Sequence, residues 1–446
     1  MDIIIAGDGE VGFHLAKTLS KVQHNITVVD PHSELLQMLQ EESDLLTVAG
    51  SSTSISVLKN AGISSCDLLI SVLHDENINI ITCILGKKLG AKRTIARVSS
   101  IEYLTDDNKS MLRGLGIDEI VSPERIAAKE ITNLLTRNTA TEIFDFSNGL
   151  LSIYMTRIDS DAVFVGKTIA QTAQLYPQMD ARIVCIIRRG QTIIPGGNDI
   201  YMAGDLIYLL LKPESLEIVK SLFKKTDFKI KSAMILGGGR IGYRAAMNLQ
   251  NQMRVRIFEQ DLDRCKKLSD DLENAMVING NGSDISLLMD EGLADTDALI
   301  ATTGSTETNI LSCLHAHKHG VKKTIALVEN INYIDVSQDI GIDTIINKKL
   351  ITASYIARFT LNGEVTSSKW LSGIDAEVFE VMVKQKSPAT KDIIMNLKIP
   401  AGVSIGGVIR DGESFIAKGN TQIETGDKVV VFSLPESANK VMKLFN

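Results

Sequence analysis

The chain of 446 residues contains most of its sequence pattern twice. The glycine-rich stretch GDGEVG at 7–12 returns as GGGRIG at 237–242, and GAKRTIARV at 90–98 returns as GVKKTIALV at 320–328. The two members of each pair are separated by the same number of residues. Matching segments nearer the C-terminus are separated by slightly fewer residues. Such a pattern is typical of a tandem duplication with small loop deletions, because self-similarity at one period marks repeated structural units. We therefore expect two copies of one arrangement.

A second type of module follows each copy of the first. The dipeptide Gly204-Asp205 returns as Gly426-Asp427, and Gly197-Asn198 returns as Gly419-Asn420. Length alone would suggest about three domains of roughly 150 residues, but the repeat predicts four. We expect the domains at 1–137, 138–222, 231–360 and 366–446, with a charged linker at 223–231 between the halves.

The longer module alternates short apolar runs with helical stretches. Strands are expected at 3–6, 26–30, 45–49, 68–72 and 94–98. Runs rich in β-branched residues without polar alternation are typical of parallel strands that helices cover on both faces. Crossover helices are predicted at Glu10–Ser20 and Glu76–Leu89, and another with Ser122 as its N-cap and Pro123 as its first residue.

The shorter module has a different pattern. Short strand-like runs at 150–158, 181–190 and 205–211 are separated by the turn sequences Pro-Gly-Gly and Ala-Gly-Asp. Strands punctuated by such turns indicate a small β-rich domain, here with about two helices.

Composition excludes several classes of function. Hydrophobic residues make up 44% and charged residues 23%, as in ordinary globular proteins. With 54 acidic and 47 basic residues, the net charge of −7 disfavours binding to nucleic acid or to an anionic membrane. No apolar run approaches the roughly 18 residues of a membrane span. The N-terminus lacks a signal-peptide pattern, and the five cysteines are scattered without a CxxC pair. We expect a soluble cytoplasmic protein without direct membrane insertion.

Each glycine-rich stretch follows an apolar strand and opens a helix, the context in which GxGxxG binds nucleotide phosphates. The first glycine allows the tight turn, the second lets a pyrophosphate approach, and the third lets the helix pack closely. Unpaired N–H groups of the helix N-terminus then face the phosphate. The predicted phosphate-binding residues are Gly7, Asp8, Gly9, Glu10, Val11 and Gly12, and in the second half Gly237, Gly238, Gly239, Arg240, Ile241 and Gly242. The predicted fold class is α/β, with two Rossmann-like doubly wound parallel sheets, each followed by a small α+β domain.

Polar residues at the strand ends extend this predicted site. Asp30 and Glu259 end the second strand of each copy, where an acid accepts hydrogen bonds from a ribose 2′-hydroxyl. An acid there repels a 2′-phosphate, so NAD or ATP is favoured over NADP. Leu73-His74 follows the predicted strand at 68–72, and Arg97 lies at the end of the predicted strand at 94–98. Both are expected at the same ligand-binding edge of the sheet. Arg97 could meet a phosphate or form a surface ion pair, and its counterpart is Leu327.

The sequence lacks groups that would perform a reaction. A dehydrogenase needs an acid or base beside the nicotinamide, yet the two shorter modules contain no histidine. GxSxG, P-loop and HExxH motifs are also absent. His315 and His319 are one helical turn apart, but nothing nearby completes a metal site, so a solvated helix end is favoured. We expect neither an enzyme nor a metal site.

These features resemble a known family. The longer module resembles the N-terminal domain of the regulator-of-potassium-conductance (RCK) family, and the shorter module resembles the family's C-terminal domain. The matching features are the glycine loop, Asp30, AGI followed by Asp67, the DENIN run ending in Asn79, and TIARV with Arg97. Two full copies in one chain resemble the peripheral subunits of Trk-type potassium uptake systems.

The resemblance implies a regulatory subunit that gates an integral-membrane potassium transporter in response to NAD(H), ATP or ADP. It implies a peripheral location at the inner face of the plasma membrane and a homo-oligomer, either a dimer or a tetramer. It assigns nucleotide contacts to the two glycine loops, Asp30, Leu73-His74, Arg97 and Glu259. Two alternatives of other classes are an NAD-dependent oxidoreductase and a scaffold whose Rossmann-like modules bind nothing.

Overall fold

The structure is a computed structural model. It describes residues 1–7, 9–20, 24–42, 45–136, 143–177, 179–188, 191–224, 229–357, 359, 365–370 and 376–445. The chain divides into two compact units. One contains residues 1–132 and 231–360, and the other contains 133–230 and 361–446. Each unit therefore combines corresponding modules from both halves of the sequence.

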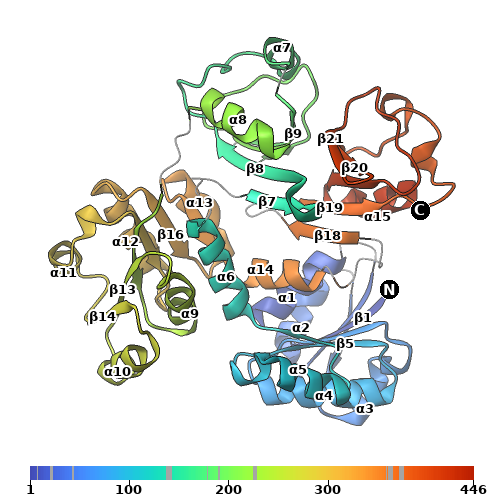
Figure 1. The fold of residues 1–446 in the computed structure, drawn as a ribbon. Helices are drawn as coiled ribbons and strands as arrows, with labels where there is room; N and C mark the ends of the chain where they lie inside the picture. The colour runs from blue at the N-terminus through green and yellow to red at the C-terminus, as the bar shows by residue number, and fades with distance from the viewer. Residues whose placement is uncertain are drawn as a thin grey trace. The chain divides into compact units, whose positions relative to one another are not determined.

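The first unit contains two parallel six-stranded sheets with the same topology (Figure 1). The strands of the first sheet are β1 (Asp2–Ala6), β2 (Asn25–Asp30), β3 (Leu46–Ala49), β4 (Leu68–Ser71), β5 (Arg93–Arg97) and β6 (Glu119–Val121). They lie in the order β3-β2-β1-β4-β5-β6. The strands of the second are β12 (Ser232–Leu236), β13 (Arg254–Glu259), β14 (Ala275–Asn279), β15 (Ala298–Ala301), β16 (Lys323–Leu327) and β17 (Thr344–Ile346), in the corresponding order. This order reverses direction at the first strand, which is the Rossmann arrangement.

Helices connect the strands of both sheets. In the first copy they are α1 (Glu10–Ser20), α2 (Ser33–Glu42), α3 (Ile55–Asn60), α4 (Glu76–Leu89), α5 (Asp106–Gly114) and α6 (Pro123–Thr136). In the second they are α9 (Arg240–Leu249), α10 (Leu262–Asp271), α11 (Ile285–Asp290), α12 (Thr306–Lys318), α13 (Ile334–Asp339) and α14 (Lys348–Ala357). The helices α1 and α4 have the predicted bounds, and Ser122 Oγ accepts the N–H of Arg125 at 3.4 Å as the predicted N-cap of α6.

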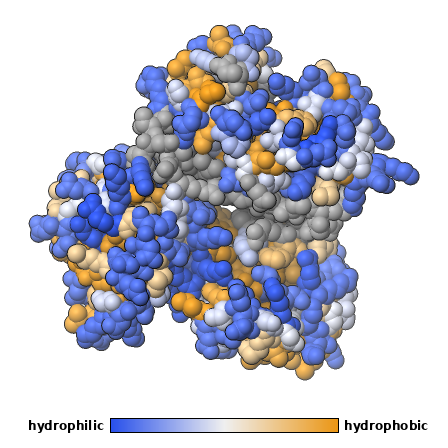
Figure 2. Space-filling model, in the orientation of Figure 1, coloured by the Kyte–Doolittle hydropathy of each residue, from blue (hydrophilic) through white to orange (hydrophobic). Residues whose placement is uncertain are grey.

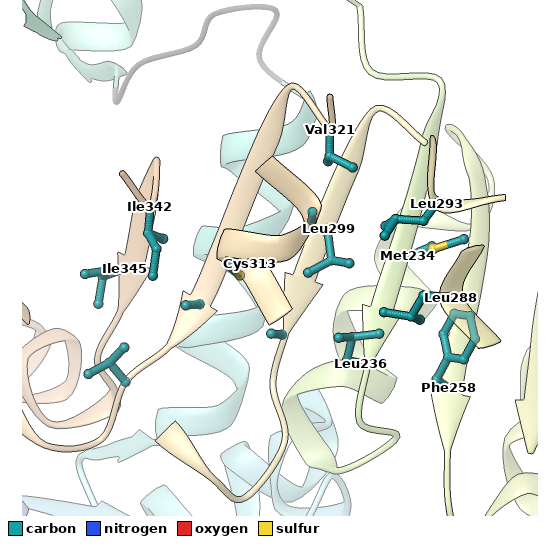
Figure 3. Packing of buried hydrophobic residues seen from close by; sticks show 14 of the residues in the cluster. Met234, Leu236, Phe258, Leu288, Leu293, Leu299, Cys313, Val321, Ile342 and Ile345 are labelled. Carbon is teal, nitrogen blue, oxygen red and sulfur yellow. The ribbon is translucent and has the colours of Figure 1, made fainter. Parts of the chain in front are cut away.

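The central strands are apolar because helices cover both faces of each sheet. In the second copy, Met234 and Leu236 on β12 pack with Phe258, Leu299 and Cys313 in one buried cluster (Figure 3). Every residue of β12 and β16 is buried, including the polar residues Ser232, Lys323 and Thr324, as expected for central strands of a sheet covered on both faces. The strands β3 and β14 are partly exposed because they lie at the sheet edges.

The second unit contains two antiparallel sheets, again with matching order. The first copy has β7 (Ile143–Phe146), β8 (Leu151–Arg157), α7 (Ile169–Leu175), β9 (Ala181–Arg188), β10 (Gln191–Ile193), β11 (Leu206–Leu211) and α8 (Leu216–Leu222). The second has β18 (Val365–Trp370), β19 (Glu377–Met382), β20 (Val403–Arg410), β21 (Glu413–Ile416), β22 (Lys428–Ser433) and α15 (Pro435–Phe445). The orders are β10-β9-β11-β8-β7 and β18-β19-β22-β20-β21, which confirms the predicted small α+β domains.

One buried ion pair occurs in both small domains. Arg188 Nε and Nη2 donate to the two carboxylate oxygens of Asp205 at 3.0 and 2.7 Å. Arg410 donates to Asp427 in the same way, at 2.8 Å for both bonds. Each aspartate follows a glycine with positive φ, +88° at Gly204 in the first copy. The repeated Gly-Asp dipeptide therefore forms a turn whose carboxylate ties two strands together.

The two small sheets share a hydrophobic core. Phe146, Tyr208 and Leu210 of the first copy form one buried cluster with Val378 and Phe432 of the second. At the centre of this packing, β20 has two glycines. A Cβ on Gly406 would lie 2.7 Å from Leu210 Cδ2, and one on Gly407 would lie 2.7 Å from Leu151 Cδ1. The glycines let the sheets approach more closely than side chains would allow.

The sequence did not predict every element. The strands β6, β10 and β17 have three residues each, too few for a recognisable period. Part of the predicted linker, 225–228, lies outside the described residues. Among the residues that the structure describes, no helix is both long enough and apolar enough to cross a bilayer.

The Arg188–Asp205 pair predicts a specific loss of stability. Arg188→Met would leave the Asp205 side chain, which is 2% exposed, without its cation. Breaking a fully buried ion pair costs about 3–5 kcal/mol; because the Arg188 side chain is 23% exposed, urea unfolding should show a smaller loss, on the order of 2 kcal/mol.

The control is Lys212→Met, which removes a half-exposed ion pair with Asp180 at 3.6 Å in the same small domain. An exposed pair contributes at most about 1 kcal/mol. Equal losses in the two variants would mean that the buried Arg188 pair stabilises the domain no more than an exposed pair does.

Candidate functional site

The glycine loops bring each first helix unusually close to its first strand. A Cβ on Gly12 would lie 1.8 Å from the carbonyl oxygen of Gly7, and one on Gly242 would lie 2.0 Å from that of Gly237. Gly7 and Gly237 have φ of +117° and +95°, which favour glycine. The first and third glycines of each loop thus allow the helix to begin close to the strand. The N-terminus of α1 or α9 then lies at the carboxyl edge of its sheet.

The middle glycines face open space. Beside Gly9, the nearest atom to an added Cβ would be Nε2 of exposed His74 at 3.9 Å, and Gly239 has no atom within 4 Å. Val11 and Ile241 are buried, so only their backbone can face a ligand. Asp8 and the side chain of Glu10 lie outside the described residues. The loops therefore leave the room that an approaching phosphate needs.

In the first copy, the strand-end acid is paired with a histidine. Asp30 is 3% exposed, and its Oδ1 accepts the backbone N–H of His32 at 3.0 Å. The same oxygen lies 2.7 Å from Nδ1 of the exposed His32 ring. The sequence predicted the position of Asp30 but not this partner, because a histidine two residues beyond a strand has no recognisable pattern.

In the second copy, the corresponding acid contacts the glycine loop itself. Glu259 Oε2 accepts the N–H of Gly238 at 3.0 Å and lies 3.3 Å from Nη1 of Arg264. Its Oε1 accepts the N–H of Asp261 at 3.0 Å. A Cβ on Gly238 would lie 3.2 Å from Glu259 Cβ and 2.4 Å from Leu268 Cδ1, so a side chain there would crowd both neighbours. The two predicted ribose acids therefore have different surroundings.

A buried asparagine joins the loops that follow β4 and β5. Asn79 Nδ2 donates to the carbonyls of Leu73 and Arg97 at 2.9 and 3.0 Å. Its Oδ1 accepts from the Leu73 N–H at 2.9 Å and from Ser71 Oγ at 2.8 Å. Leu73-His74 and Arg97 are thus held at one edge, as the strand order predicted. In the sequence, Asn79 was recognised only as the end of the DENIN run, without a structural role.

The matching residue of the second copy, Asn309, makes the same connections. Its Nδ2 donates to the carbonyls of Thr303 and Leu327, and its Oδ1 accepts from the Thr303 N–H. Because both copies retain it, this asparagine is a structural tie of the sheet edge and does not distinguish the two sites.

Arg97 and Leu327 do distinguish the two sites. Arg97 is partly exposed, but its Nε is buried and has no hydrogen-bond partner among the described residues. A buried donor without an acceptor is costly, typically by about 1–3 kcal/mol. Leu327 is 4% exposed and offers no donor from its side chain. A ligand oxygen could therefore satisfy a group in the first copy that the second copy lacks.

Four of the buried cysteine thiols are poor nucleophiles. Burial raises the pKa of the Cys66 thiol to about 11 and that of Cys185 to about 12, and it raises those of Cys83 and Cys313 further. A thiol with a raised pKa is a poor nucleophile. The part of the chain that the structure describes also contains no cluster of side chains that could hold a metal ion. The arrangement of the glycine loops suits binding of a phosphorylated ligand.

The close contact at Gly12 predicts that adding one methyl group there lowers the stability of the protein. Gly12→Ala would place a carbon 1.8 Å from the Gly7 carbonyl oxygen, and backbone cannot yield as a side-chain end can. Overpacking of this kind costs about 1–3 kcal/mol, which thermal unfolding should detect. Gly114→Ala is the control, because an added Cβ at the end of α5 has no atom within 4 Å. Unchanged unfolding of Gly12→Ala would contradict the close contact.

Comparison with protein families gives matches to both types of module. The model of the TrkA-N domain matches residues 3–123 and 233–348, within the two Rossmann-like sheets. The model of the TrkA-C domain matches residues 153–224 and 378–446, within the two small domains. The predicted resemblance to RCK domains in tandem is confirmed. The domain boundaries predicted from the sequence stay a prediction.

Similar proteins extend over the whole chain. The "Trk system potassium uptake protein TrkA" of Haemophilus influenzae is 32% identical over 100% of this chain and 98% of its own length. The protein of the same name from Halomonas elongata is 31% identical over 97% and 95%. A TrkA homologue of Methanosarcina mazei is 31% identical over both full lengths.

Solved structures share the fold at lower identity. The "GsuK channel bound to NAD" aligns with a TM-score of 0.61 and 20% identity over 100% of this chain and 78% of that one. The "GsuK bound to ADP" aligns with a TM-score of 0.51 and 16% identity over 80% and 68%.

The family comparison also decides the class of protein. TrkA and RCK proteins are regulatory rather than enzymatic, which confirms the expectation that this protein is not an enzyme. Matching domain models in both halves and a full-length relative above 30% identity lead to one assignment: the chain belongs to the TrkA family of potassium uptake proteins, with tandem TrkA-N and TrkA-C domains.

Proposed function

We propose that this protein is a nucleotide-binding regulatory subunit that gates a membrane potassium transporter. The observation that supports this most directly is the geometry of the first glycine loop. Gly9 faces open space, the α1 N-terminus is fixed by the Gly7–Gly12 contact, and the buried acid Asp30 ends the adjacent strand. A loop, a helix N-terminus and an acid in this order are the elements that bind an adenosine diphosphate group.

The proposed ligands are NAD(H), ATP and ADP. Asp30 and Glu259 suit a ribose with free hydroxyls, because a carboxylate repels a 2′-phosphate. Two channel structures of the same fold are described as bound to NAD and to ADP. The residues that we assign to the nucleotide are those of the two glycine loops, Asp30, Leu73, His74, Arg97 and Glu259.

The proposed partner is an integral-membrane subunit of a potassium uptake system. The full-length relatives are named as Trk system potassium uptake proteins. We place this protein in the cytoplasm, peripheral at the inner face of the plasma membrane, where it would bind the transporter. Gating then requires that a nucleotide bind two conformations with different affinity, because only differential affinity shifts a conformational equilibrium.

We also propose that the protein self-associates, as a dimer or tetramer. Both copies of the Rossmann-like module expose apolar side chains at matching positions, on or beside the fourth and fifth helices. These residues are Ile81, Met111 and Leu115 in the first copy and Leu311, Val336 and Ile340 in the second. Figure 2 shows hydrophobic residues among hydrophilic ones over the α4–α5 region. Repeated exposure of this kind is typical of an interaction surface.

A panel of nucleotides tests the proposed function. We expect NAD, NADH, ATP and ADP, but not NADP, to raise the melting temperature, since a ligand at 100 times its Kd adds about 2.7 kcal/mol. Asp30→Ala should weaken binding to the first site about 10- to 150-fold, because a hydrogen bond to a charged group contributes about 1.5–3 kcal/mol. Titration calorimetry measures that loss.

The matched control is Glu34→Ala, which removes an exposed acid from the first turn of α2. It should leave affinity unchanged. If no nucleotide stabilises the wild-type protein, it is a scaffold instead, and nucleotide gating is wrong.

A second prediction concerns the inequality of the two sites. We expect Arg97→Ala to reduce discrimination between ATP and ADP, because a guanidinium can bind phosphate oxygens through two charged hydrogen bonds. Leu327→Ala should leave discrimination intact, since leucine has no such donor. Both variants should be assayed for nucleotide affinity and for activation of the reconstituted transporter. Loss of discrimination only in Leu327→Ala would reverse the assignment.

A further inference from the structure

An arginine of the second Rossmann-like domain reaches the loop edge of the first. Arg244 lies on α9, and its Nη1 donates to Ser122 Oγ at 3.1 Å. Its Nη2 donates to the carbonyl oxygen of Ser99 at 3.0 Å. One guanidinium therefore bonds to two loops of the other domain, those that follow β5 and β6.

Both acceptors belong to the edge at which we place the first nucleotide. Ser99 is two residues beyond Arg97, whose buried Nε has no partner among the described residues. The N–H groups of Ser99 and Ser100 donate to Glu76 Oε2 at 2.7 and 2.9 Å. Glu76 therefore holds this loop from within the first domain, and Arg244 holds it from the second.

The guanidinium is set in a partly buried and charged environment. Burial lowers the pKa of Arg244, while the nearby carboxylate of Glu124 opposes that effect. Glu124 is 6% exposed, and its Oε2 has no hydrogen-bond partner among the described residues. Attraction to this carboxylate helps to retain Arg244 at the edge of the first sheet.

The second domain makes the equivalent connection differently. The repeat aligns Ser99 with Glu329 and Ser122 with Asn347. Asn347 Nδ2 donates to the carbonyls of Val328 and Glu329 at 2.7 and 3.2 Å. The loops after β16 and β17 are thus joined by a side chain of their own domain. At the position matching Arg244, the first domain has His14, which lacks the forked donor geometry of a guanidinium.

We propose that Arg244 is a positioning residue that couples the first nucleotide site to the contact between the two Rossmann-like domains. This rests on the proposed nucleotide function. A nucleotide that moves the strand-five loop changes the bonds that Arg244 makes, so occupancy of the first site is transmitted to α9. The second site differs because the side chain of Asn347 joins its two loops from within its own domain.

The test uses hydrogen–deuterium exchange and calorimetry with ADP, in a Glu259→Ala background that disables the second site. In that background, ADP should slow exchange both in the loop at 98–101 and in α9. Arg244→Gln should weaken ADP binding about 5- to 10-fold, within the usual range of coupling between sites, and should abolish the response of α9. Arg244→Lys, which retains the charge but not the fork, should give an intermediate result.

A second variant separates coupling from mere stabilisation. Adding Ser122→Asn to Arg244→Gln supplies the internal tie of the second domain, so ADP affinity should recover while α9 stays unresponsive. Asn248→Ala is the control, because Asn248 Nδ2 donates to Thr132 Oγ1 at 3.1 Å elsewhere on the same helix. It should preserve both affinity and response.

An unchanged response of α9 in Arg244→Gln would overturn the inference while leaving nucleotide binding intact. If ADP binds neither the wild-type protein nor the Glu259→Ala variant with Arg244 intact, the proposed function is wrong. This inference is then wrong as well.

Discussion

The approach of Gly12 to the carbonyl oxygen of Gly7 is the constraint on which the candidate site depends. Without side chains at these positions, α1 can begin directly above the end of β1, and its N-terminus faces the carboxyl edge of the sheet. Asn79 then holds the loops beyond β4 and β5 at that edge. The close glycine contact and the asparagine bonds both recur in the second copy. The two copies therefore share the backbone arrangement of the candidate site.

Within this common frame, the two copies differ in charge and in partners. Asp30 is paired with an exposed histidine, whereas Glu259 is bonded to its own glycine loop and to Arg264. Arg97 of the first copy is replaced by Leu327 in the second. These differences lie at the carboxyl edges of the sheets and not in the sheet cores, where both copies remain apolar. The two copies therefore keep one topology and differ in the side chains at this edge.

Much of this structure could be predicted from the sequence, for physical reasons. The buried strands lack polar alternation, the glycine loops have a spacing that sterics impose, and Asp30 and Arg97 lie at strand ends that a parallel sheet brings together. The three-residue strands could not be predicted because three residues are too few to establish the alternation of a strand. Arg244 could not be predicted either, since a contact between domains leaves no periodic pattern in the sequence of a helix.

The Gly406-Gly407 pair has a consequence for the symmetry of the chain. In the shared core of the small domains, these glycines accommodate Leu210 and Leu151, whereas the repeat gives Val184 and Cys185 at the same positions of the first copy. Two first copies paired in this way would place Val184 where Gly406 lies, 2.7 Å from Leu210 Cδ2, so the leucine side chain would have to move. The shared core therefore joins two unequal halves, a fused pair in which small residues of one copy face leucines of the other.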